Sequence, residues 1–187
     1  NPGARVYEGS TATENLVSAG SVWKYLDDGS NQGTAWRQPD FDDGSWDSGP
    51  AELGYGDGNE VTTLSFGPNS NAKYPTTYLR RTFNAAEVAD FSRLNIGLRR
   101  DDGAVIYLNG IEVARSGMPA GVISYLTTAN SVAGGADETT FFNLEVSADA
   151  LVEGENTLAV EIHQVSGSSS DISFDLRLDG TKSSTEN

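Results

Sequence analysis

The residues best suited to chemistry are pairs of aspartates followed by glycine. Such segments stand at 27–29, 42–44 and 101–103. Carboxylate oxygens are the ligands that calcium prefers, and Asp101 and Asp102, which fall between two predicted strands, are the first candidates for a calcium site. Aspartate and glycine are also ordinary turn formers, because aspartate caps turns and glycine accepts positive φ. Each acidic segment therefore has a second interpretation that involves no ion.

Aromatic residues in polar loops form a second group with chemical potential. Sugars present apolar C–H faces that stack on aromatic rings, and their hydroxyls bond to acidic, amide and basic side chains. Trp36, Tyr55 and Tyr74 lie in loops of this kind and are candidate stacking platforms. Trp23 and Trp46 are instead predicted to belong to the core. Packing of a loop aromatic over a neighbouring strand remains the alternative for each candidate.

The only histidine, His163, closes a predicted strand and is followed by Gln164. If the strand that ends at residue 100 finishes at the same tip, a polar cluster forms there that suits sugar hydroxyls. Its members would be Arg100, Asp101, Asp102, His163 and Gln164. The alternative is a cross-strand pair between His163 and Asp175 that only stabilises the last hairpin.

Signatures of catalysis are missing from the chain. There is no Gly-x-Ser-x-Gly segment, no His-Glu-x-x-His pair and no phosphate-binding glycine loop. Glycosidic cleavage needs two carboxylates at a set separation, and 27 acidic residues make some such pair a matter of chance. We therefore predict a domain that binds rather than catalyses.

The charge of the chain limits its partners. The 27 acidic residues outnumber the 12 lysines and arginines, for a formal net charge of −15. Such a surface repels phosphate backbones and anionic membranes, which argues against nucleic acid as a partner. No apolar run reaches membrane-spanning length, which argues against membrane insertion. The absence of cysteine excludes disulfides and thiolate metal sites.

Short apolar runs with a period of two dominate the rest of the sequence. In 93–100, for example, Leu94, Ile96 and Leu98 share one face of a predicted strand. The Asn109-Gly110 pair is a strong hairpin signal, and 147–152 resembles a single helical turn. Strands are predicted at 22–26, 77–83, 93–100, 104–108, 111–115, 122–127, 140–146, 156–163 and 172–178.

Many short strands with turn signals between them predict an all-β fold, an antiparallel β-sandwich of jelly-roll type. We expect residues 21–180 to form this single domain. Residues 1–20 are predicted to be a polar N-terminal segment or linker, and residues 181–187 a C-terminal linker stub.

Four segments carry a resemblance to a known family. They are 39–46 (PDFDDGSW), 78–83 (YLRRTF), 105–110 (VIYLNG) and 154–160 (GENTLAV). In this order they resemble the N-terminal sugar-binding domain of family 2 glycoside hydrolases, a galactose-binding-like jelly roll. The chain is also similar to carbohydrate-binding modules appended to secreted bacterial polysaccharide-degrading enzymes and surface proteins.

The resemblance implies a function as well as a fold. In the family the catalytic carboxylates lie in a separate barrel domain, for which this chain has no room. The 101–103 segment resembles the paired aspartates of protective-antigen-type lectin domains, where calcium and sugar are held together. We therefore expect a non-catalytic carbohydrate-binding module of a secreted or cell-surface bacterial protein. Its partners would be a polysaccharide or oligosaccharide and other domains of the parent protein; the alternative is a structural or interaction domain without a sugar site.

Overall fold

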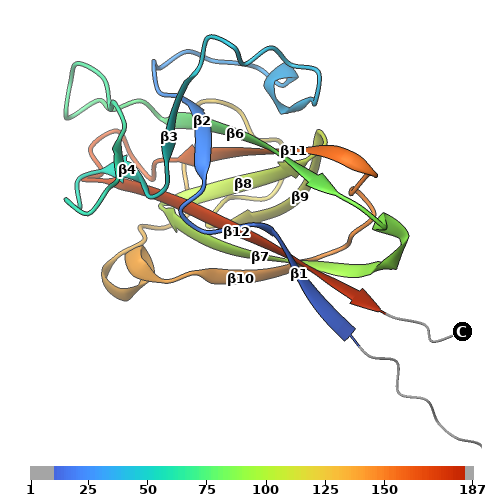
Figure 1. Ribbon diagram of the computed structural model, residues 1–187. Helices are drawn as coiled ribbons and strands as arrows, with labels where there is room; N and C mark the ends of the chain where they lie inside the picture. The colour runs from blue at the N-terminus through green and yellow to red at the C-terminus, as the bar shows by residue number, and fades with distance from the viewer. Residues whose placement is uncertain (1–10, 184–187) are drawn as a thin grey trace, which may run out of the picture.

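The protein is a sandwich of two six-stranded sheets that face each other (Figure 1). The computed structural model describes residues 11–183. One sheet, sheet A, contains β1 (Thr11–Val17), β4 (Leu53–Tyr55), β5 (Thr62–Thr63), β7 (Phe91–Asp101), β10 (Phe142–Val146) and β12 (Ile172–Ser183). The other, sheet B, contains β2 (Val22–Leu26), β3 (Asp47–Pro50), β6 (Thr76–Ala85), β8 (Gly103–Leu108), β9 (Ile111–Ser116) and β11 (Gly154–His163). Three short 3₁₀ helices lie in the connections, η1 (Ala35–Arg37), η2 (Val88–Asp90) and η3 (Gly135–Thr139).

The strand order explains how the chain closes the sandwich. Sheet A runs β10-β7-β12-β4-β5, with β1 also paired to β12, and sheet B runs β3-β2-β6-β11-β8-β9. All ladders are antiparallel except the short one between β4 and β5. Successive strands repeatedly cross from one sheet to the other, as in a jelly roll. The predicted all-β antiparallel sandwich is confirmed.

Most predicted strands are present, and two predicted segments differ. Residues 122–127 form no strand although their burial alternates, because they pair with no neighbouring strand. They lie in a loop over sheet B, where Ile123 packs, and a turn from Thr127 N to Ser124 O at 2.9 Å interrupts them. Residues 147–152 contain one hydrogen-bonded turn, from Leu151 N to Ala148 O at 2.9 Å, and no helix. Strands β1, β3, β4 and β5 were not expected, because their short or polar sequences carry no clear alternation.

The domain boundaries differ from the predicted ones as well. Residues 11–17 belong to sheet A, where Thr11 pairs with Ser183, and β12 runs three residues past position 180. A sheet ladder satisfies backbone groups whatever the side chains are, so a polar segment can extend the fold. Residues 1–10 and 184–187 of the predicted linkers lie outside the described residues.

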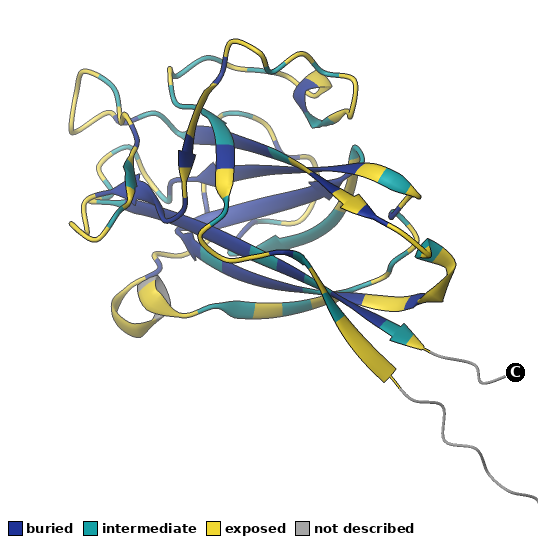
Figure 2. Ribbon diagram, viewed as in Figure 1, coloured by how far each residue is buried: buried dark blue, intermediate teal, exposed yellow. Residues whose placement is uncertain are grey.

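The main core lies between the two sheets. Leu94, Ile96 and Leu98 point into it with exposures of 0–1%, as their spacing predicts. Trp23 from sheet B meets Phe174 from sheet A edge to face, with ring centroids 4.9 Å apart. Figure 2 shows this buried interior running along both sheets.

A second apolar cluster covers the outer face of sheet B. Its members are Trp36, Trp46, Tyr78, Val105, Tyr107, Met118, Ile123, Ala129 and Ala159. They come from the sheet and from two loops, 27–46 and 117–133, that lie across it. This face of the sheet is therefore covered by protein instead of solvent.

Both described chain ends lie at the same tip of the sandwich. Strands β6 and β12 begin, and β7 and β11 end, at the opposite tip, where the loops 64–75 and 164–171 gather. Thr11 and Ser183 lie beside each other at the other end (Figure 1). The loop tip consequently points away from the place where the chain enters and leaves the fold.

The four family-like segments meet in pairs. Asn109 of the hairpin donates to Oδ1 of Asn156 at 2.8 Å, and its own Oδ1 accepts from Thr157 N at 2.8 Å. Arg80 of the second segment donates to Asp43 of the first at 2.8 Å and also to the carbonyl of Trp36. In this chain, these motif residues act as connections between strands and loops.

Candidate functional site

The structure brings the predicted polar cluster together at the loop tip, but buries it. Arg100 and Gln164 are 9% and 2% exposed, and the remaining three members, Asp101, Asp102 and His163, are fully buried. Arg100 donates to the backbone oxygen of Asp102 at 2.6 Å, and Gln164 donates to the hydroxyl of Tyr55. These five residues lie close together, as predicted. None of them, however, presents its polar group at the surface, where a sugar could bind.

Asp102 holds three chain segments together. Its Oδ1 accepts from Ala133 N at 3.0 Å, and its Oδ2 accepts from Val165 N at 2.7 Å and from Ser169 Oγ at 3.2 Å. Three of the roughly four lone-pair sites of this carboxylate are thus directed to protein donors. The arrangement therefore explains Asp102 as a clamp between the loops and β8.

Coordination of a metal ion requires several donor side chains that lie close together. Among the side chains that the structure describes, no three His, Asp or Glu residues come together in a way that could hold a metal ion. Calcium at Asp101 and Asp102 stays a prediction.

His163 fastens the loop 117–133 to sheet B. Its Nδ1 lies 2.7 Å from Thr127 O, and because a carbonyl only accepts, this nitrogen carries a hydrogen. Its Nε2 faces the Glu161 carboxylate at 3.3 Å. The expected alternative, a cross-strand pair with Asp175, is wrong, because His163 lies in sheet B and Asp175 in sheet A.

Glu161 is the centre of a buried charge network on the outer face of sheet B. Its Oε1 accepts from the Tyr107 hydroxyl at 2.6 Å and from Arg37 at 3.1 Å. Burial by itself would raise the pKa of Glu161, but the contact with His163, the hydrogen bond from Tyr107 and the charge of Arg37 lower it below its usual range. The network therefore anchors η1, which carries Arg37, to the sheet.

The predicted stacking aromatics are not free platforms. Trp36 is fully buried, with its ring 4.8 Å from Tyr78, and Tyr55 is 6% exposed. Both predictions of an exposed ring are wrong. The loop that carries Trp36 folds back on sheet B, and Tyr55 belongs to strand β4 and packs in the main core. Tyr74 is half-buried, and the backbones of Gly29 and Gly67 lie against its ring. A contact between Tyr74 and sugar stays a prediction.

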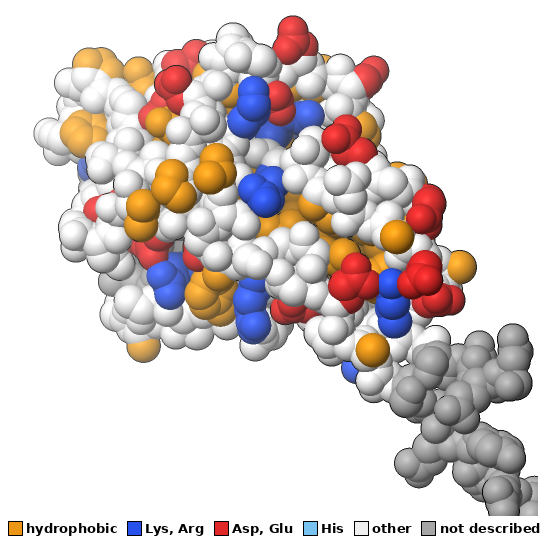
Figure 3. All heavy atoms as spheres, viewed as in Figure 1, with side chains coloured by type: hydrophobic (Ala, Val, Ile, Leu, Met, Phe, Trp, Pro, Cys, Tyr) orange, Lys and Arg blue, Asp and Glu red, His pale blue; other side chains and the backbone are white. Residues whose placement is uncertain are grey.

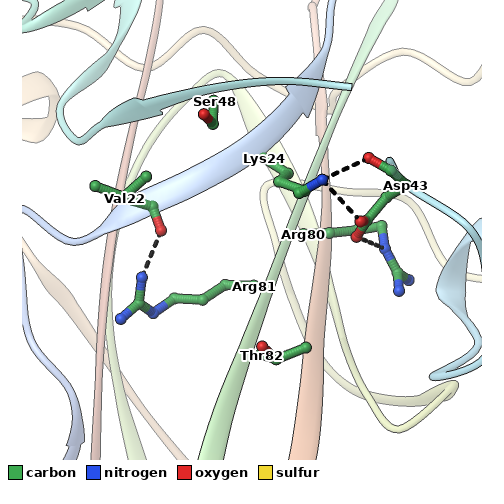
Figure 4. A pocket seen from close by; sticks show the side chains of 7 residues that line it. All are labelled: Val22, Lys24, Asp43, Ser48, Arg80, Arg81 and Thr82. Atoms are coloured by element: carbon green, nitrogen blue, oxygen red, sulfur yellow. Dashed lines mark hydrogen bonds and ion pairs between the residues drawn. The ribbon is translucent and has the colours of Figure 1, made fainter. Parts of the chain in front are cut away.

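A polar hollow lies elsewhere, where β2 separates from β6 (Figure 4). The β2–β6 ladder contains only three residue pairs, from Lys24–Arg80 to Leu26–Tyr78, whereas β2 pairs with β3 from Val22 onward. The opening has a volume of about 330 Å³. The residues that line it are Val22, Lys24, Asp43, Ser48, Arg80, Arg81 and Thr82.

Side chains occupy the place of the missing ladder. Arg81 reaches across the opening and donates to Val22 O, as the dashed line in Figure 4 shows. On the other side Asp43 accepts from Lys24 at 3.1 Å and from Arg80 at 2.8 Å. Figure 3 shows Lys and Arg side chains near the middle of the face that it presents, with hydrophobic side chains beside them.

The charges in the hollow are unevenly compensated. Burial of Asp43 would raise its pKa, but hydrogen bonds from Arg80 and Lys24 and their charges lower it. For Arg81, burial lowers the pKa of the guanidinium and no carboxylate opposes the effect. An oxyanion entering the hollow would meet a positive charge that the protein itself leaves unpaired.

Sequence reasoning missed this hollow. Arg80 and Arg81 were noticed as part of a family-like segment, but Lys24 and Ser48 had no signal of their own. The double arginine in an acidic chain was the one available hint. The opening itself depends on where β2 leaves β6, and no local pattern encodes that separation.

The fold and the hollow define an all-β sandwich domain with a polar surface site. No protein-family model matches the chain, and no curated protein matches it at the level of sequence. Among the residues that the structure describes, no helix is long and apolar enough to cross a membrane.

The solved structures that the domain resembles are bacterial β-glucuronidases of glycoside hydrolase family 2. Bacteroides uniformis β-glucuronidase 2 is 17% identical with a TM-score of 0.52, and the match covers 91% of this chain and 18% of that one. The β-glucuronidase of an uncultured Clostridium species is 17% identical with a TM-score of 0.53, covering 95% and 30%. That of Ruminococcus gnavus is 11% identical with a TM-score of 0.54, covering 96% and 30%.

This chain thus spans only 18–30% of the length of these enzymes. At such identities the likeness establishes the fold. The predicted resemblance to the β-sandwich domain of these hydrolases is confirmed in that sense.

Proposed function

We propose that this domain is a non-catalytic carbohydrate-binding accessory domain of a larger secreted or cell-surface glycoside hydrolase, and that the hollow between β2 and β6 is its binding site. One observation carries the proposal: the hollow combines hydrogen-bonding groups of the kinds that sugars need with an apolar side chain at its edge. Lys24 and Arg81 supply donors, Ser48 and Thr82 supply hydroxyls, and Val22 is 53% exposed.

The contents of the hollow favour binding over cleavage. Glycoside hydrolysis needs two carboxylates across a cleft, and the lining residues include a single one, Asp43. That carboxylate is tied to Arg80 and Lys24 and is therefore not available as an acid or a nucleophile. Accessory status is further supported by the partial coverage of the β-glucuronidase chains.

A shallow site of this kind binds weakly, with a Kd of roughly micromolar to millimolar. Retention on a polymer would then depend on several sites acting together in the parent protein. Because Thr11 and Ser183 lie at one tip, attachment at that end leaves the side of the sandwich, with its hollow, accessible to a glycan.

The test blocks the hollow with a larger side chain, and methionine is used because a new aromatic ring could itself stack on a sugar. Thr82 is an exposed lining residue of β6, and Asn84 is exposed two positions further on the same face of that strand, outside the hollow. We expect Thr82→Met to weaken glycan binding at least about tenfold, whereas Asn84→Met, the matched control, leaves it unchanged. Binding is measured by calorimetry and by retention on insoluble polysaccharides.

Two results would contradict the proposal. Equal binding by both variants would place the sugar elsewhere, with Tyr74 as the next candidate. No binding of any glycan by the wild-type domain at millimolar concentration would favour the structural or interaction domain. The surface for that role would be a groove of about 300 Å³ at the tip where the chain ends meet, lined by Ile111, Val113, Val146 and Ala150 together with three polar residues.

A further inference from the structure

Arg81 lacks the counter-ion that other arginines of this domain have. Its Nη1 donates to a carbonyl, its Nε has no acceptor, and no carboxylate among the described residues lies within ion-pair distance of it. Carboxylate partners are present for Arg37, Arg80, Arg93, Arg99, Arg115 and Arg177. A partly buried cation without a partner is unfavourable, and in a chain with a net charge of −15 a partner would have been easy to supply.

The surroundings of Arg81 do not neutralise it. The hollow contains the three cations Lys24, Arg80 and Arg81 against the single anion Asp43, so its formal charge is positive. Asp43 already accepts from Lys24 and Arg80, and its carboxylate is bonded on their side of the opening. The guanidinium of Arg81 is thus left to face the remainder of the hollow.

The geometry points to an acidic sugar as the ligand: we propose that the hollow selects glycans whose ring bears an oxyanion, a carboxylate or a sulfate ester, and that Arg81 pairs with that group. This inference rests on the proposed carbohydrate-binding function. The planar guanidinium fork matches the two oxygens of such a group. Ser48 and Thr82 would bond to ring hydroxyls, and Val22 would contact the C–H face.

The dimensions favour a sugar over a protein segment or a bare ion. A volume of about 330 Å³ is at the lower end of small-molecule pockets and accommodates one or two sugar rings. A free inorganic anion would use only the guanidinium and would leave the hydroxyls and the apolar edge unoccupied. The net charge of −15 by itself would disfavour an anionic polysaccharide, but the charge inside the hollow is locally positive.

The experiment compares ligands that differ only in charge. Oligogalacturonides and their methyl esters have the same rings, but only the acids carry carboxylates. At low salt we expect the wild-type domain to bind the acid about tenfold or more tightly than the ester, and added salt to reduce this preference. A sulfated galactan and its desulfated form constitute the second arm, which distinguishes sulfate from carboxylate.

Variants then assign the preference to one residue. Arg81→Gln should remove the discrimination between acid and ester while leaving weak binding of the ester. Arg93→Gln, which changes an exposed arginine of sheet A that pairs with Glu145, should leave it intact. Thermal melts of both variants check folding, and the acid–ester comparison on the wild-type domain needs no variant.

The outcomes separate the two proposals. Equal affinity for charged and neutral forms in both arms would overturn this inference and leave the carbohydrate-binding proposal standing. Preference for the sulfated form alone would support the oxyanion and identify it as sulfate. No binding of any charged or neutral glycan would overturn both. Discrimination that survives Arg81→Gln would refute the role of this residue.

Discussion

Replacing Asp102 with alanine should disconnect the loop tip from the sheet. The wild-type carboxylate is fully buried and accepts from two backbone N–H groups, those of Ala133 and Val165, and from the Ser169 hydroxyl. In Asp102→Ala the hydroxyl of Ser169 can turn to water, because this serine is only partly buried. The N–H of Ala133 is buried and loses its acceptor, and the N–H of Val165, which is partly buried, loses its acceptor as well.

The magnitude follows from these two donors. A buried polar group left without a partner costs about 1–3 kcal/mol, and the partly buried Val165 N–H costs less because water can reach it in part. Asp102→Ala should therefore lower the free energy of unfolding by about 2–4 kcal/mol. In a domain of this size that corresponds to a fall in Tm of roughly 10 °C. Asp102→Asn retains one acceptor oxygen and should lose about half as much. Asp40→Ala, at an exposed aspartate, should change stability by less than about 0.5 kcal/mol.

The assay also separates a clamp from a calcium ligand. Urea unfolding and thermal melts are recorded for wild type, Asp102→Ala and Asp102→Asn in excess calcium and in chelator. A clamp predicts the same loss in both conditions, whereas an ion that binds only the native state would raise the wild-type Tm. The reasoning is refuted if Asp102→Ala costs less than about 0.5 kcal/mol, or if the cost appears only in the presence of calcium.

Two further residues give independent tests. Asn156 is fully buried and its amide makes hydrogen bonds to Val152, Gly154 and Asn109. Asn156→Ala should therefore lower the free energy of unfolding, measured in urea, by at least about 3 kcal/mol. A decrease of less than about 1 kcal/mol would contradict this role. Folding lowers the pKa of Glu161. The ionised carboxylate therefore contributes fully to stability above its unfolded pKa of about 4.3, and this contribution is lost as the pH falls through the lower pKa of the folded state. Stability measured between pH 6 and pH 2.5 should therefore fall less steeply for Glu161→Gln than for wild type, and parallel curves would argue against this.

Much of the sandwich could be predicted from local pattern. Alternation in 93–100, 156–163 and 172–178 predicted which side chains face the core, and Leu98, Val160 and Phe174 are buried there. The period of a strand is a local property, so it is legible without knowledge of the partner strand. Strands β4 and β5, with three and two residues, contain too little sequence to display a period.

The family-like segments were informative about fold and much less about function. Asn109 and Asn156 bond to each other, and Arg80 bonds to Asp43. Residues that join strands to loops recur wherever the same framework is built. Their recognition therefore indicated the galactose-binding-like framework, whereas the candidate site depends on neighbours such as Lys24 and Ser48 that belong to no motif.

The sequence by itself determined the all-β class and the inward faces of the long strands, because both depend on strand period. It offered the meeting of Asp102 with His163 at one tip only as one of two arrangements, and the strand order decided between them. The tertiary structure alone decided what covers each face. The loops 27–46 and 117–133 lie on sheet B and bury Trp36 and His163, although their polar composition suggested exposure. It also decided where β2 leaves β6, and so left Arg81 in an open hollow without a counter-ion. Contacts between segments distant in the chain set both outcomes, and such contacts leave no periodic trace in the residues that make them.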